Sequence, residues 1–193
     1  GGLGGKLKSA AVGIAGAMAA AFVVDKVVGF GKELYNVGNQ AELWNKKAGV
    51  VFGDQIGTVE KWASANAAAM GMTNSEAKGA AAALGDLLVP MGATREQAAT
   101  MSTDIVGLSG ALSAWSGGTR SAAEVSEILA KAMLGETDGL TGLGISIKQS
   151  EVQTRALAVA QAEGRTEVTA MDKAIATQQL VIEESTDAQT AWA

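Results

Sequence analysis

The stretch Thr94–Trp115, TREQAATMSTDIVGLSGALSAW, decides the fold class of this chain. Its large apolar residues recur every three or four positions, which is the period of one face of an α-helix. This stripe consists of Met101, Ile105, Leu108, Leu112 and Trp115. At its start, Thr94 stands three residues before Gln97, which is the spacing of a capping box. The stretch therefore predicts a helix that begins near residue 95 and buries one face.

The same two signals recur along the rest of the chain. Further pairs with capping-box spacing are Thr73 with Glu76, Ser121 with Glu124, Ser146 with Gln149 and Thr169 with Asp172. These pairs predict helix starts near residues 74, 122, 147 and 170. Glycine or proline stands where each apolar stripe ends, at Gly71, Pro90 with Gly92, Gly117 with Gly118, Gly135–Gly144 and Gly164. Because no alternating strand of useful length interrupts this pattern, we expect an all-α chain with five or six helices in this part.

The composition favours helices and removes several kinds of chemistry. Hydrophobic residues make up 48% of the 193 residues with a single Pro, and many of them are Ala, which loses no side-chain entropy in a helix. No Cys is present, so disulfides and thiol chemistry are excluded. No His is present either, which removes the usual imidazole base and most zinc sites. We therefore do not expect an enzyme.

The polar loop Glu136–Gly144, ETDGLTGLG, contains residue types that also occur in metal and phosphate sites. Glu136 and Asp138 lack the regularly spaced oxygen ligands and terminal Glu of a calcium loop. Gly139, Gly142 and Gly144 are followed by no Gly-Lys-Ser/Thr, as a phosphate-binding loop would require. We expect no cofactor or metal site, and we expect these glycines to permit positive φ in a tight connection.

Charge is unevenly placed along the chain. Residues 1–50 carry six Lys against one Asp and two Glu, a net charge of +3, while the chain as a whole carries −5. The remaining residues therefore carry −8. Such an acidic body argues against sequence-specific nucleic-acid binding.

Residues 9–24, SAAVGIAGAMAAAFVV, form an uncharged apolar arm. As a helix at ~1.5 Å per residue it would be roughly 24 Å long, shorter than the ~30 Å hydrocarbon core of a bilayer. Its small residues would allow close helix–helix contact in an assembly. Two other interpretations stay open, an ordinary buried helix and a segment that enters a membrane. The membrane interpretation would use Ala10, Val12, Ile14, Met18, Phe22, Val23 and Val24.

A second apolar pattern follows the arm with alternating steps of four and three residues. This seam consists of Val23, Val27, Phe30, Leu34, Val37, Ala41 and Trp44, and continues through Ala48 and Val51. Its spacing is that of the a and d positions of a coiled coil. One interpretation is self-association through parallel copies of this helix, and the other is a long amphipathic helix within its own domain. We therefore expect an arm and coiled-coil-like helix over 1–48 and an Ala- and Gly-rich helical bundle or array over 49–193.

The body of the chain carries a further pattern of short motifs. They include Val50-Val51-Phe52-Gly53-Asp54, Leu84-Gly85-Asp86-Leu87-Leu88 with Met91-Gly92, and Asp187-Ala188-Gln189. The most specific one is Ala132-x-Leu134-Gly135-Glu136-Thr137 followed by Leu140 and Leu143-Gly144-Ile145. In these motifs, residues 50–192 resemble the core region of phage tail tape-measure proteins.

This resemblance implies a structural and assembly protein without catalytic residues. Tape-measure proteins run along the lumen of a phage tail and act as the ruler for its length. The resemblance implies as partners other copies of the chain (a trimer, for example), tail tube and tail tip proteins, tail assembly chaperones and the host membrane. It places the protein in the tail lumen or tip, and in the host envelope during genome delivery. We expect a fragment of a longer protein, and the alternative function is a membrane-inserting, pore-forming helical protein.

Overall fold

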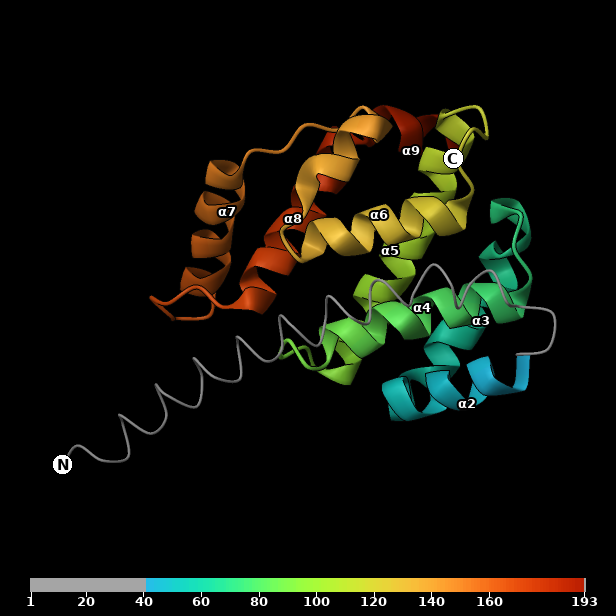
Figure 1. Ribbon diagram of the computed structural model, residues 1–193. Helices are drawn as coiled ribbons and strands as arrows, with labels where there is room; N and C mark the ends of the chain where they lie inside the picture. The colour runs from blue at the N-terminus through green and yellow to red at the C-terminus, as the bar shows by residue number, and fades with distance from the viewer. Residues whose placement is uncertain (1–40, 193) are drawn as a thin grey trace.

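The computed structural model of the protein describes residues 41–192, which fold into helices with no strand among them (Figure 1). The all-α prediction is therefore confirmed for this part of the chain. The α-helices are α2 (Ala41–Phe52), α3 (Ile56–Asn66), α4 (Asn74–Leu88), α5 (Arg95–Trp115), α6 (Ala122–Met133), α7 (Gln149–Ala162), α8 (Ala170–Glu184) and α9 (Thr186–Trp192). Short 3₁₀ helices are η2 (Gly53–Gln55), η3 (Ala68–Met70) and η4 (Thr137–Leu143).

Four of the five predicted capping boxes start the helices expected of them. Thr73, Thr94, Ser121 and Thr169 each accept a hydrogen bond from the backbone N–H three residues later, at 3.1–3.2 Å. The acidic or amide side chain at that later position accepts from the backbone N–H of the capping residue in return. Because each box satisfies N–H groups that a helix start leaves free, these four starts are local in origin.

The fifth box, Ser146 with Gln149, is wrong. There the backbone N–H of Lys148 donates to Glu151 Oε2 at 2.9 Å, and the helix begins at Gln149 instead of near 147. The preceding Ile145 is only 2% exposed, because it packs into the core. Residues 145–148 belong to no helix, and they connect η4 to α7.

The number of helices also exceeds the prediction of five or six. Seven α-helices follow residue 55 within the described part of the chain, because the predicted last helix is divided at Ser185. The hydroxyl of Ser185 donates to the carbonyl of Val181 at 2.6 Å, and the amide of Gln189 donates to the carbonyl of Ile182 at 2.7 Å. These side-chain bonds occupy carbonyls at the end of α8, where α9 turns away.

The longest helix, α5, lies at the centre of the described fold (Figure 1). Helices α2, α3, α4, α6 and α9 all contact α5. Helix α8 contacts α6, and α7 packs on the outer side of α8. One continuous apolar core joins side chains from all of these helices except α7.

Alanine and glycine let the helices of this core approach closely. The α2–α4 contact shows this best, since an added Cβ at Gly79 would lie 2.7 Å from the Trp44 ring. At the other end of the contact, an added Cβ at Gly85 would lie 2.6 Å from the Phe52 ring. These two pairs show that α2 and α4 run parallel. Glycine in α4 therefore makes the groove that receives the large side chains of α2.

Candidate functional site

The predicted self-association seam enters the described structure at α2. Residues Val23, Val27, Phe30, Leu34 and Val37 lie outside the described residues, as does the possible membrane segment of residues 9–24. Ala41 is exposed, whereas Trp44 is 2% exposed and Ala48 is fully buried. The proposed domain boundary after residue 48 falls within α2.

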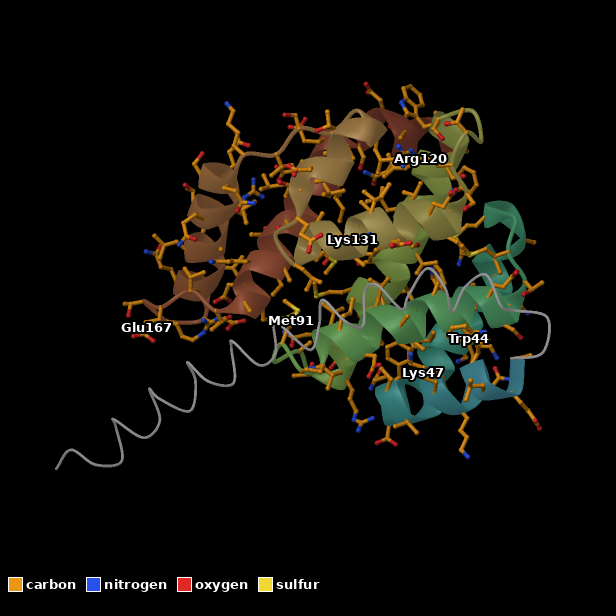
Figure 2. The ribbon with its side chains drawn as sticks, viewed as in Figure 1. Trp44, Lys47, Met91, Arg120, Lys131 and Glu167 are labelled. Carbon is orange, nitrogen blue, oxygen red and sulfur yellow. The ribbon has the colours of Figure 1, made fainter. Side chains whose placement is uncertain are left out.

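Trp44 is buried against α4 of its own chain. Figure 2 shows Trp44 and Lys47 close together at the α2–α4 contact. The ammonium of Lys47 lies 5.9 Å from the centroid of the Trp44 ring and 3.7 Å from Asp86 Oδ2 of α4. Two interpretations of the seam were left open, self-association and an amphipathic helix within its own domain. The packing of Trp44 in the glycine groove of α4 is what the second interpretation expects at this residue.

The loop that carries the most specific motif serves packing. The backbone N–H of Gly135 closes α6 by bonding to Ala132 O at 2.9 Å, with φ of 99°, and Gly144 closes η4 with φ of 77°. Between and after them, Leu140 is fully buried and Ile145 nearly so. The motif therefore returns the chain from α6 to the core through a short helical connection.

Two of the three loop glycines have a different role from the one expected. Gly144 has positive φ as predicted, but Gly139 and Gly142 do not. A Cβ at Gly139 would lie 3.1 Å from Ile128 Cγ2, and one at Gly142 would lie 3.0 Å from Arg120 Nη2. These two glycines permit close approach to α6 and its N-terminal flank rather than an unusual backbone angle.

Glu136 and Asp138 are the acidic residues of this loop. No group of three acidic side chains close enough to hold a metal ion occurs within residues 41–192. The nearby side chains that the structure gathers, Leu140 and Ile145, are apolar and buried.

The tryptophans divide between the core and the surface. Trp44 lies in the core, and Trp62 is partly buried against it. Trp115 is 57% exposed and Trp192 is 38% exposed, so the apolar stripe of α5 leaves the core at its last member. Trp115 ends α5 and Trp192 ends α9, and these two helices pack together. Sequence reasoning grouped Trp115 with the core stripe, because a periodic pattern does not show where a helix emerges from its neighbours.

A shallow groove of about 500 Å³ opens between α7 and α8. Its lining mixes polar and apolar side chains from Ser146, Ile147, Ser150, Glu151, Thr154, Arg155, Ala158, Leu180 and Glu184. Arg155 is held at one side by a two-bond ion pair to Glu183, at 2.7 and 2.9 Å. The sequence did not single out this groove, because it depends on how far apart two helices lie.

Among residues 41–192, no helix combines the length and the apolar character that a membrane crossing requires. No family model matches the chain, and neither a curated protein nor a solved structure matches it.

Proposed function

We propose that this chain is a structural segment of a phage tail tape-measure protein. It acts as part of the ruler in the tail lumen or at the tail tip and contributes to genome delivery through the host envelope. The proposal rests on the resemblance of residues 50–192, and above all on the motif Ala132–Ile145. That motif consists of large buried residues, glycines that let other side chains come close, and glycines that end helical segments.

The residues of this motif set how helices pack, which supports a role that depends on the shape of the protein. Leu140 and Ile145 contribute to the core, and Gly135 and Gly144 end helical segments. A ruler or an assembly scaffold needs side chains that set how helices pack, and it needs no reacting groups. The motif therefore contributes packing side chains and helix ends, which are the features that a ruler or scaffold requires.

The proposed partners are tail tube and tail tip proteins, assembly chaperones and other copies of the chain. Trp115 and Trp192 are candidates for contacts with a surrounding protein, because half-exposed indoles are frequent anchors of interfaces. Self-association rests on residues Val23–Val37, since Trp44 already has a partner within the chain. Leu34→Asp should abolish the oligomer and leave the helical content unchanged. Cross-linking that traps the same oligomer in this variant would remove the seam from the proposal.

Tail length provides the direct test of the ruler. In the phage that encodes the chain, deletion of residues 149–184, which removes α7 and α8, should shorten the tail. A matched variant replaces the same residues with an equal number drawn from another helical sequence, and its tails should keep the parental length. Electron micrographs of both sets of tails give the measurement. Unchanged length in the deletion would exclude the ruler.

A membrane-inserting protein is the second candidate. The uncharged run of residues 9–24 favours it, because a helix of this composition loses little by entering a lipid bilayer. Dye leakage from anionic vesicles, measured with the whole chain and with a chain lacking residues 1–30, tests this candidate. Equal leakage from both chains would eliminate the arm as the membrane element.

A further inference from the structure

Helix α7 is attached to the fold differently from the other helices. Within the described residues, α8 is the one helix that α7 packs against extensively. The residues that α7 buries are Val152, Ala156 and Ala160, and the first two join Ala176 of α8 in a small apolar cluster separate from the main core. Figure 1 shows α7 at the edge of the molecule, with α8 between it and the remaining helices.

Little free energy holds the N-terminal half of α7 in place. Only three residues of this cluster are buried, and two of them are alanines, whose methyl groups remove only a small apolar area from water. Ile147, Val168 and Leu180 pack against the cluster but are only partly buried. The ion pair between Arg155 and Glu183 is largely exposed, and exposed pairs contribute little to stability. One further bond joins the side-chain amide of Gln149 to the carbonyl of Gly135, at 3.2 Å. The groove between α7 and α8 lies on this same half, so packing there is incomplete.

The C-terminal end of α7 is held much more firmly. The backbone N–H of Arg165 donates to Ala160 O at 2.9 Å, which closes the helix around Gly164 with φ of 73°. The guanidinium of Arg165 then bonds Glu163 at 2.6 Å and the buried carboxylate of Asp172 in α8 at 2.6 and 2.7 Å. This arrangement, which we call the Arg165 clamp, ties the end of α7 to the start of α8.

We propose that α7 is a flap that opens away from α8 about the Arg165 clamp while the core helices stay folded. Regions with few buried apolar contacts open locally at a free energy well below that of global unfolding. The N-terminal half moves most, because its attachments are the weak ones. Opening uncovers Val152, Ala156 and Leu180, the apolar side chains that α7 and α8 share. The inference concerns the fold alone and does not depend on the proposed function.

The absence of Cys from the chain allows a direct test with single cysteines. Ala156→Cys places a thiol under the flap, and Ala130→Cys places one in the main core. The two alanines are 0% and 1% exposed, so the sites are matched in burial and in residue type. Under native conditions, an excess of a thiol reagent should label Cys at 156 at least about tenfold faster than Cys at 130. Equal labelling rates would overturn the proposal, since both sites would then open only by global unfolding.

Hydrogen exchange of the unaltered chain shows whether α7 opens without any cysteine substitution. Amides between Val152 and Ala160 should exchange at least about tenfold faster than those between Ile105 and Leu112 of α5, after correction for intrinsic rates. Within α7, exchange should be faster near Val152 than near Ala160. Protection in α7 equal to that in α5 would overturn the flap, whatever the labelling shows.

Discussion

Arg165 and Asp172 form a two-bond ion pair across the turn between α7 and α8: Nη2 donates to Oδ1 at 2.6 Å and Nη1 donates to Oδ2 at 2.7 Å. The Asp172 side chain is 2% exposed, while that of Arg165 is 34% exposed. Thr169 adds bonds to the same carboxylate from its backbone N–H and its hydroxyl. A capping box and a buried ion pair therefore share one acidic side chain.

Arg165→Met should lower the free energy of unfolding by about 2–3 kcal/mol, because it leaves the buried carboxylate of Asp172 without its charged partner. Urea denaturation measures the change. Arg155→Met is the matched control, since Arg155 also makes two bonds to a carboxylate, that of Glu183, but on the surface. It should lower the free energy of unfolding much less than Arg165→Met does, because solvent screens an exposed pair. An equal loss of unfolding free energy in the two variants would contradict the prediction that the burial of Asp172 makes its ion pair the more important one.

The stability of the protein should fall in acid, and Asp172 should account for part of the fall. Hydrogen bonds from Arg165 hold the pKa of Asp172 well below its usual range, although burial opposes them. The folded chain therefore keeps the carboxylate ionised at pH values where the unfolded chain, with a pKa of about 3.9, takes up a proton. This contribution is complete above about pH 5 and is lost as the pH falls toward the pKa of the folded state. In urea titrations, the stability difference between the parent and Asp172→Asn should be largest near neutral pH and shrink steadily on acidification; a difference that stays constant down to pH 2.5 would contradict it.

Gly79→Ala should destabilise the fold although alanine is the better helix former. The new methyl group would lie 2.7 Å from the Trp44 ring, and overpacking of this kind costs about 1–3 kcal/mol. The higher helix propensity of alanine stabilises the helix by only ~1 kcal/mol. Gly49→Ala in α2 serves as the control, since no atom lies within 4 Å of its added Cβ, and it should raise the melting temperature. The prediction fails if both variants melt above the parent.

Leu140→Ala should cost about 2–5 kcal/mol of unfolding free energy, because Leu140 is fully buried. Chemical denaturation followed by circular dichroism measures the loss. Leu43→Ala in α2 is the comparison, since Leu43 is 58% exposed and its truncation should change stability by less than about 0.5 kcal/mol. A mild effect at Leu140 would mean that η4 contributes little to the core.

Much of the candidate site could not be predicted from the sequence. The periodic stripe of α5 predicted its buried residues up to Leu112 but also included Trp115, which the structure leaves 57% exposed. Glycine motifs indicated a tight connection around residues 135–144, yet they did not show that Gly139 and Gly142 face Ile128 and Arg120. The groove beside α7 had no sequence signal, since residues 30 positions apart line it together.

The amino-acid sequence by itself determined the helices, most of their starts and their ends. A capping box such as Thr94 with Gln97, a glycine of positive φ such as Gly135, and a stripe with helical period all act over a few neighbouring residues. The tertiary structure alone decided which helix faces meet. Trp44 packs on Gly79, and Ile145 is buried in the core ahead of α7, because each contact depends on the shape and burial of residues distant in the chain.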